Sequence, residues 1–467
     1  MFPKPLLINI LPKPPSFRKL LGPSFIILGL GLGSGEIILW PYLASNYGLG
    51  IIWGAVIGIT FQFFMNMEIE RYALVHGESV FVGLARKMRF VSYWFLLSTF
   101  LPWVWPGIAA SSASIFSYVF GLNENSYLAI IFLVVIGLIL SLGPILYKTV
   151  ESFQKILILI SIPTIFLLSI ILAKSENWIA LTKGIVGIGD NYFFLPESIA
   201  ISSFLAALAY AGAGGNLNLA QAFYIKEKGY GMGKYAGRIT SLLTGTKEEV
   251  SITGSTFEVN TENVKIFNVW WKKINIEHFV VFWLTGSITI LLLALLSFST
   301  TYGLNLKTGD ISFIFAESIE IGKAIFPFTG TFFLLIAGLT LFGTQLTVFD
   351  ATSRILAENT LLASFGKLDE KHFSKIYYLV LWIQILVGIL IFLFGFRQPL
   401  QLIIIAAVLN AFAMFVHTGL TLWLNLTNLN KALRPSIFRI AVMILAFTFY
   451  GGFSIYTILT ILFNFKF

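Results

Sequence analysis

Long apolar runs alternate with short polar segments along the whole chain. A spanning helix needs about 20 apolar residues, and eleven runs approach or exceed that length, at residues 20–44, 50–73, 92–120, 127–143, 155–173, 198–224, 278–300, 327–350, 376–395, 399–424 and 437–464. The ten-residue segments of alternating polarity that are typical of membrane barrels do not occur in the sequence. We therefore predict an all-α polytopic membrane protein with about 11 transmembrane helices.

Composition and charge support this class. The chain is 57% hydrophobic and 11% charged, and it has no cysteine, which excludes disulfides and thiolate metal ligands. Its net charge of +9 follows the positive-inside rule rather than indicating a nucleic-acid partner, because 25 of the 31 Lys and Arg residues fall on one side if the N-terminus is cytoplasmic. We predict a multi-pass protein of the cell membrane, in contact with the lipid bilayer, with a cytoplasmic N-terminus and an extracellular C-terminus.

The first apolar run contains an interruption, the stretch from Gly29 to Glu36. Four glycines in seven positions disfavour a continuous helix, since each costs about 0.5–1 kcal/mol relative to alanine. Glu36 then places a carboxylate near the middle of the span. We interpret the run as two half-helices with an unwound joint, which survives in a membrane only where its backbone groups meet protein, water or a ligand.

The sixth run has a similar interruption. The stretch from Tyr210 to Asn216 contains three glycines and is followed by Asn218 and Gln221. Interruptions in spans one and six occupy corresponding positions of two five-helix halves, which favours an inverted-repeat secondary transporter with its site at the midplane. The alternative, that these glycines only allow close packing of helices, remains open.

Half-helix ends define the chemistry of such a site. Their N-termini present free N–H groups and their C-termini present carbonyl oxygens that replace water around a cation. Glu36 adds a carboxylate suited to proton or cation coupling, or else pairs with a distant basic residue. The predicted substrate-binding and ion-binding residues are Gly33, Ser34, Gly35, Glu36, Ala213, Gly214, Gly215 and Asn216.

Other polar residues inside the predicted spans are candidates for a pathway or for coupling. They are Asn66, Asn218, Gln221, Thr344, Asn410 and His417. Asn66 shares a helix face with Gln62 and Glu70, each four residues away. Two structural alternatives remain open: the hydroxyl of Thr344 can bond to its own helix, and His417 can bond to a neighbouring helix instead of relaying protons.

The runs also suggest a domain organisation. We predict a cytoplasmic arm at residues 1–19, a first five-helix repeat at 20–173 and an extracellular loop at 174–197. A second repeat follows at 198–424 and an eleventh helix at 437–464. The second repeat contains residues 226–277, whose polar composition indicates a cytoplasmic loop rather than a domain.

With these motifs in hand, the chain resembles the Nramp family (natural resistance-associated macrophage proteins), proton-coupled divalent-metal transporters with the LeuT-type fold. The resemblance covers most of the chain. It implies a 5+5 inverted repeat with helices 1 and 6 broken, plus one extra C-terminal helix. The motifs that carry it are Gly22-Pro23-Ser24, Gly33-Ser34-Gly35-Glu36, Tyr47 to Gly50 with Trp53, Asn216, Arg71-Tyr72 with Gly77-Glu78, Gly229 to Gly233, and Asp350 to Asn359.

The two joints depart from the family pattern. Family members that carry manganese and iron have Asp-Pro-Gly-Asn in the first joint and Met-Pro-His-Asn in the second. Here Gly33 and Glu36 stand at the Asp and Asn positions, while Ala213 and Gly215 stand at the Met and His positions. The softest ligand, the thioether, is therefore missing. The ligands that remain for a metal are Glu36 and Asn216.

These observations lead to one functional hypothesis with two alternatives. We predict a secondary active transporter that couples uptake of a cation, a divalent metal other than manganese or iron, to protons or sodium. The alternatives are a cation-coupled symporter of a small organic solute and a non-transporting membrane sensor. Neither an HExxH motif nor a nucleophile elbow occurs, so an enzyme is not expected. We expect no cofactor, and the oligomeric state stays open.

Overall fold

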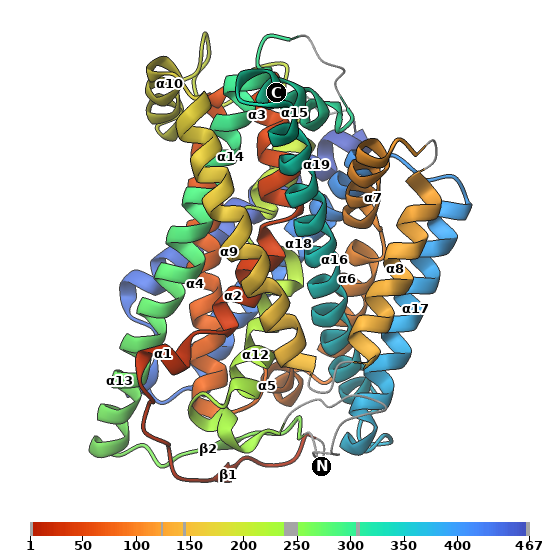
Figure 1. The fold of residues 1–467 in the computed structure, drawn as a ribbon. Coiled ribbons are helices and arrows are strands. Elements are labelled where there is room, and N and C mark those ends of the chain that lie inside the picture. Colours follow the sequence, from red (N-terminus) through yellow and green to blue (C-terminus); the bar gives the residue numbers. More distant parts are fainter. Residues whose placement is uncertain (1–2, 123–124, 143–145, 238–250, 305–308, 464–467) are drawn as a thin grey trace.

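The protein is a bundle of helices that run mostly along one direction (Figure 1). The computed structural model describes residues 3–122, 125–142, 146–237, 251–304 and 309–463. Within these ranges, nine helices are long and apolar enough to cross a membrane. The predicted third and sixth spans are each split into shorter helices. The prediction of an all-α protein with about 11 spans is therefore confirmed.

The first half of the chain forms the predicted spans one to five. Its elements are β1 (Leu7–Ile8), α1 (Phe17–Leu20), α2 (Pro23–Gly31), η1 (Ser34–Leu39), α3 (Trp40–Tyr47), η2 (Leu49–Ile51), α4 (Trp53–His76), α5 (Val80–Lys87), α6 (Val91–Trp103), α7 (Gly107–Phe120), α8 (Asn125–Leu142) and α9 (Leu146–Leu172). The segment η1 is a π-helix. Span one thus consists of α2, η1 and α3.

The second half forms spans six to eleven and their connections. Its elements are α10 (Ser175–Ile185), α11 (Ile201–Ala209), η3 (Gly215–Ala220), α12 (Gln221–Lys228), η4 (Gly231–Tyr235), β2 (Ser255–Thr256), α13 (Thr261–His278), η5 (Phe279–Leu284), α14 (Thr285–Thr301), α15 (Ser312–Ala324), α16 (Pro327–Ala363), η6 (Glu370–His372), α17 (Phe373–Leu393), α18 (Pro399–Asn428), η7 (Lys431–Leu433) and α19 (Ile437–Phe463). Span six consists of α11, η3 and α12.

Several helix boundaries differ from the prediction, and three of the differences have a clear physical cause. The third span breaks between Trp103 and Gly107, where Pro106 has no N–H to continue the hydrogen-bond ladder. Helix α9 begins at Leu146, ahead of the predicted residue 155, because charged side chains in its first turns pair with neighbours. Helix α16 continues to Ala363, beyond the predicted residue 350, since Arg354 Nε bonds to Asp350 Oδ1 at 2.8 Å one turn earlier.

The predicted loop at 226–277 contains more structure than expected. Its last part is helix α13, which continues through the π-helix η5 into α14. Strand β2 in this region pairs in parallel with β1 of the N-terminal arm, and Trp270 Nε1 donates to the Pro12 carbonyl at 2.6 Å. Residues 238–250 of this loop, and residue 464 of the predicted eleventh helix, lie outside the described residues. Helices α10 and α15 were not predicted.

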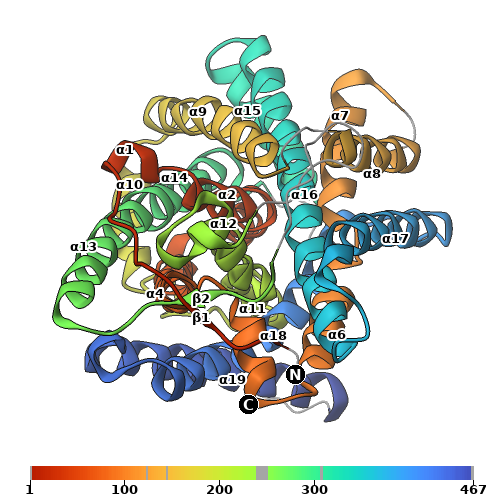
Figure 2. The same cartoon turned by 90° about the horizontal axis from the view of Figure 1, so that it is seen from below.

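The broken helices occupy the centre of the bundle. Seen from below, α2, α11 and α12 lie inside a ring that includes α8, α9, α17 and α19 (Figure 2). The span from Pro23 to Tyr47 is 100% buried in its most apolar window, whereas α8 and α9 are 33% and 28% buried in theirs. The N-terminal end of the chain lies at the bottom of the bundle in Figure 1 and α19 ends at the top.

Candidate functional site: the paired joints of spans one and six

The first joint lies between α2 and η1. Helix α2 ends at Gly31, and Gly33 leaves the helical region before the π-helix η1 starts at Ser34. Its glycines weaken the helix locally, and Thr344 of α16 crosses at this point, donating from Oγ1 to the Gly29 carbonyl at 2.9 Å. The predicted break in span one is therefore confirmed, and a neighbouring helix satisfies one of the carbonyls that it frees.

The second joint separates α11 from η3. Helix α11 ends at Ala209, and the chain turns at Gly214 and Gly215, whose φ angles of +76° and +56° are in the left-handed region that favours glycine. The 3₁₀ segment η3 then leads into α12. The break predicted in span six is also confirmed.

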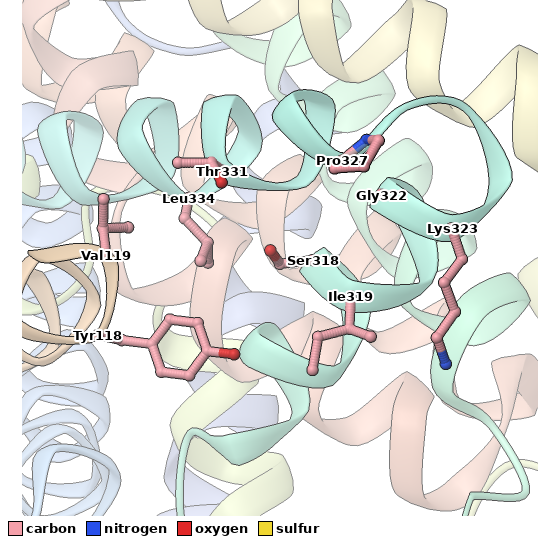
Figure 3. A pocket seen from close by; sticks show the side chains of 9 residues that line it. All are labelled: Tyr118, Val119, Ser318, Ile319, Gly322, Lys323, Pro327, Thr331 and Leu334. Atoms are coloured by element: carbon pink, nitrogen blue, oxygen red, sulfur yellow. The ribbon is translucent and has the colours of Figure 1, made fainter. Parts of the chain in front are cut away.

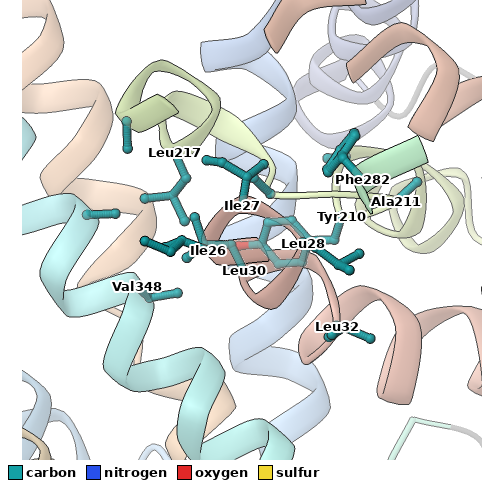
Figure 4. Packing of buried hydrophobic residues seen from close by; sticks show 14 of the residues in the cluster. Ile26, Ile27, Leu28, Leu30, Leu32, Tyr210, Ala211, Leu217, Phe282 and Val348 are labelled. Atoms are coloured by element: carbon teal, nitrogen blue, oxygen red, sulfur yellow. The ribbon is translucent and has the colours of Figure 1, made fainter. Parts of the chain in front are cut away.

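Backbone contacts join the two joints directly. A Cβ added at Gly35 would overlap the carbonyl oxygen of Tyr210, and one added at Gly31 would lie 3.0 Å from the Cα of Gly212. Around this crossing, apolar side chains of the first half-helix α2 pack with apolar side chains from η3, η5 and α16 (Figure 4). The glycines therefore serve close packing as well as unwinding of the two helices.

Gln62 of α4 holds both ends of the second joint. Its Nε2 donates to the Ala209 carbonyl at 3.0 Å, and its Oε1 accepts from the Gly214 N–H at 3.1 Å. One side chain thus replaces two backbone bonds that the broken helix lacks. The sequence placed Gln62 on the same face as Asn66 but did not indicate this role, because the partners are 147 and 152 residues away.

Glu36 is fully buried just after the first joint, with 0% of its surface exposed. Its carboxylate points to α14: a Cβ added at Gly286 would lie 3.6 Å from Oε1, next to side-chain atoms of Leu28 and Ile59. Neither carboxylate oxygen has a hydrogen-bond partner among the residues that the structure describes. An unpaired charge in such surroundings is costly, so this carboxylate needs a proton or a cation.

Asn216 faces a different neighbour. Its Nδ2 donates to Ser98 Oγ at 2.8 Å and to Thr99 Oγ1 at 2.9 Å, both on α6, and its Oδ1 has no partner in the described ranges. The two predicted metal ligands, Glu36 and Asn216, thus have different surroundings. Among the described residues no group of three or more His, Asp or Glu side chains could hold a metal ion.

Helix α18 supports the second joint with two of the predicted residues. Asn410 Nδ2 donates to the Tyr210 hydroxyl at 2.9 Å, and His417 Nε2 lies 3.0 Å from the Gly215 carbonyl oxygen. Because a carbonyl only accepts, Nε2 of His417 carries the proton of that bond. The histidine is therefore bonded to a neighbouring segment, as in the structural alternative.

Gln154 of α9 is a polar residue at the first joint that the sequence analysis missed. Its Nε2 donates to the Gly343 carbonyl at 2.8 Å and also to Thr347 Oγ1, and its side chain packs against Gly29. The predicted fifth span began at residue 155, one position later, so this residue was assigned to a loop. Recognising charged pairs such as Glu151 with Lys155 as helical would have extended the span.

The remaining predicted residues are buried. Three of them, Asn66, Asn218 and Gln221, lie between the joints and the end of the bundle at which the chain starts. Gln221 Nε2 donates to Glu70 Oε1 of α4. Both polar atoms of Asn66 and of Asn218 have no partner within the described part of the chain, although both residues are 0% exposed. The buried residues of the joints themselves are Gly33, Ser34, Gly35, Ala213, Gly214 and Gly215.

Two described cavities differ in their relation to the joints. A small one of about 10 Å³ adjoins the second joint, where Trp103 stacks on Tyr210 with ring centroids 5.4 Å apart, and Gln345 contributes a polar group. A larger one of about 350 Å³ lies away from the joints, between α7, α15 and the start of α16 (Figure 3). Of these two cavities, only the small one adjoins the candidate site.

Solved structures share the arrangement of these helices. A variant of the manganese transporter of Eremococcus coleocola superposes with a TM-score of 0.68 at 12% identity, covering 98% of this chain and 91% of that chain. The fold is of the LeuT type. MhsT in complex with L-phenylalanine matches with a TM-score of 0.52 at 14% identity, over 94% of this chain and 98% of that one.

A third solved structure is also similar in fold. MHP1, a nucleobase-cation-symport-1 family transporter, matches with a TM-score of 0.52 at 11% identity, over 98% of this chain and 97% of that one. No family model matches the sequence, and no curated protein matches it either. With this fold and its apolar helices, the chain is a multi-pass membrane protein.

Proposed function

We propose that the protein is an ion-coupled secondary active transporter whose substrate site lies at the paired joints. Two half-helix breaks meet at the centre of the bundle, which is where transporters of this architecture bind substrate. The observation that carries the proposal is the fully buried carboxylate of Glu36, which has no partner among the described residues. When no cation occupies the site, only a proton can neutralise that group.

The substrate that we propose is a small hard cation, a divalent metal other than manganese or iron. Glu36 supplies a carboxylate, while Asn216 Oδ1 and the carbonyls of the unwound segments supply further oxygens once Asn216 turns from α6 toward Glu36. Oxygen ligands suit magnesium and calcium, and no thioether or thiolate stands at the joints to favour softer metals. In this proposal Glu36 is the principal ligand.

A second candidate is symport of a small organic solute, with the cation as coupling ion. Its support is the stacked pair of Trp103 and Tyr210, which opens on the small cavity, together with Trp103 Nε1, which has no hydrogen-bond partner in the described ranges. Aromatic faces and one free donor are the groups that bind a flat solute. The present cavity accommodates about one water, for which roughly 10–15 Å³ is needed, so binding requires opening.

A flux screen in proteoliposomes separates these functions. Purified protein is tested with Mg²⁺, Ca²⁺, Mn²⁺, Na⁺, aromatic amino acids and nucleobases, each under imposed pH and sodium gradients. We expect accumulation of Mg²⁺ or Ca²⁺. Accumulation of an organic solute alone would support the second candidate, and binding without movement of any solute would support a sensor and overturn the transporter proposal.

We also propose that the N-terminal arm is cytoplasmic. The basis is the excess of Lys and Arg on that side of the predicted spans. The chain has no cysteine, so single cysteines introduced in place of Lys13 and Lys174 can be labelled with a membrane-impermeant thiol reagent in intact cells. We expect labelling at position 174 only, and labelling at position 13 only would reverse the orientation.

A further inference from the structure

A second group of buried ionisable side chains lies between the joints and the end of the bundle at which the chain starts. It consists of Glu70 on α4 and of Glu277 and His278 at the end of α13, and it is completed by Ser24 in the first turn of α2. All four residues are at most 1% exposed. Charged residues inside a membrane protein are costly and mark functional sites by default, and the role proposed for Glu36 does not use these.

Ser24 bridges Glu277 and His278. The serine hydroxyl donates to Glu277 Oε2, and its oxygen lies 2.8 Å from His278 Nδ1. A hydroxyl has one proton, so when that proton points at Glu277, Nδ1 must be the donor to the serine oxygen. The bridge therefore links a carboxylate to an imidazole through a group that both accepts and donates a proton.

Glu70 connects this bridge to the second broken helix. Its Oε1 accepts from Gln221 Nε2 of α12 and lies 3.8 Å from His278 Nδ1. Glu70 Oε2, Glu277 Oε1 and His278 Nε2 have no hydrogen-bond partner among the described residues. Each of these groups retains the capacity to bind a proton.

Two buried amides belong to residues that lie within one helical turn of Glu70 and Gln221 along the chain. Asn66 is one helical turn before Glu70 and shares its face, since Gln62 and Glu70 both reach the sixth span from that side. Asn218 is three residues before Gln221 in a 3₁₀ segment, where such residues eclipse. Neither amide has a partner in the described chain, so both keep unused hydrogen-bonding groups near the cluster.

The surroundings favour a proton over a metal ion. The described residues hold no group of three metal-ligating side chains. The basic groups near the cluster are engaged in ion pairs, Arg439 with Glu68 and both Lys155 and Lys228 with Glu151. The titratable and charged groups that face it from the packed elements are Arg439 of α19, Lys228 of α12, Lys155, Tyr147 and Glu151 of α9, and Tyr230 before η4. Calcium and magnesium prefer carbonyl and carboxylate oxygens to an imidazole.

We propose that Glu70, Glu277 and His278, bridged by Ser24, form a proton-binding site that holds the coupling proton of the transporter. In one state an imidazolium donates from Nδ1 to Ser24, and Ser24 donates to the Glu277 carboxylate. When Glu277 takes the serine proton, the serine takes the Nδ1 proton, and the products are a neutral carboxylic acid and a neutral imidazole. Charge and protons balance, and Glu70 beside Nδ1 stabilises the imidazolium.

The position of the site explains how its proton would couple to transport. Its members tie the half-helices α2 and α12 to α4 and α13, so a change of protonation alters the bonds that hold both half-helices at one end of the bundle. The π-helix η5 follows His278 directly, and such segments often occur at functional positions. This coupling role rests on the proposed function, whereas proton binding does not.

Infrared difference spectra of the full-length protein, recorded between acid and alkaline pH, test proton binding without any substrate. We expect a carboxyl signal that titrates in the wild type, is lost in Glu70→Gln or Glu277→Gln, and shifts its midpoint in Ser24→Ala. Glu317→Gln is the matched control, because Glu317 is an equally buried carboxyl on α15, outside the cluster. A titration unchanged in all three cluster variants would overturn the site.

Proteoliposomes then test coupling. With a solute that the wild type accumulates under a pH gradient, Glu70→Gln should lose that accumulation but keep exchange of labelled for unlabelled solute without a gradient. Accumulation equal to that of the wild type would overturn the coupling role. A wild type that moves no solute would instead refute the proposed transporter, while the spectra would still decide whether the proton site exists.

Discussion

The backbone of Gly35 lies against the carbonyl oxygen of Tyr210, so closely that a Cβ at Gly35 would overlap that oxygen. These two residues belong to spans one and six, and their contact is where the two broken helices cross. Interiors are packed to crystal density and do not yield freely. The crossing therefore depends on the missing side chain.

Replacing Gly35 by alanine should destabilise the protein. The added methyl must displace backbone rather than a flexible side chain, and overpacking of this kind costs about 1–3 kcal/mol or more. Thermal unfolding in detergent measures the effect. Gly452→Ala on α19 is the control, because no heavy atom of the described residues beyond its own surroundings lies within 4 Å of that position. Equal unfolding temperatures for the two variants would contradict the proposed crossing.

Replacing Gln62 by leucine should weaken the second joint. The change leaves the Ala209 carbonyl and the Gly214 N–H without their partner, and each buried unpaired group costs about 1–3 kcal/mol. Gln384→Leu on α17, which loses its bond to Ser353 at 3.1 Å, serves for comparison. We expect the larger loss of stability for Gln62→Leu, measured by denaturation of purified protein. An equal loss would show that the two bonds of Gln62 stabilise the protein no more than the bond of Gln384 does.

Replacing Glu36 by glutamine should leave the protein folded but insensitive to its cation. The neutral amide removes a buried charge that has no partner in the described ranges, so stability without ligand should not fall. A ligand at 100 times its dissociation constant stabilises the wild type by about 2.7 kcal/mol. Thermal shifts with Mg²⁺, Ca²⁺ and Mn²⁺ compare the variant with Glu317→Gln, which should respond like the wild type. A full response in Glu36→Gln would remove this residue from the site.

Replacing His417 by glutamine should leave the pH dependence of transport unchanged. The histidine already donates from Nε2 to the Gly215 carbonyl, and an amide can make the same bond. His417→Ala should instead lose about 0.5–1.5 kcal/mol, because the Gly215 carbonyl then loses its side-chain hydrogen bond. Flux measured across a pH series distinguishes the two roles, and a shifted profile in His417→Gln would restore the proton relay.

Replacing Trp270 by phenylalanine should loosen the N-terminal arm. The indole N–H donates to the Pro12 carbonyl at 2.6 Å, and loss of this hydrogen bond costs about 0.5–1.5 kcal/mol. The smaller phenyl ring adds a loss of packing at this buried position. Limited proteolysis near the N-terminus should become faster. Trp94→Phe is the control, since Trp94 Nε1 has no partner among the described residues, and equal cleavage rates would show that the arm is held by other contacts.

The sequence by itself determined the class of protein, the number of spans and the two broken helices. These are local properties: the length of an apolar run and the density of glycine act on the chain where they occur. The same reasoning found Glu36 and the polar face of α4. It misplaced the start of α9, because charged residues ended the apolar run before the helix ended, and so it missed Gln154.

The tertiary structure decided which polar groups meet. Gln62 reaches the second joint, Asn216 turns to α6 instead of toward Glu36, and Glu70 approaches His278 from a helix about 200 positions earlier in the chain. Such partners depend on how each helix is rotated and where it crosses its neighbours. Close packing of the whole bundle sets these rotations, so the partners follow from the assembled core and not from any single stretch.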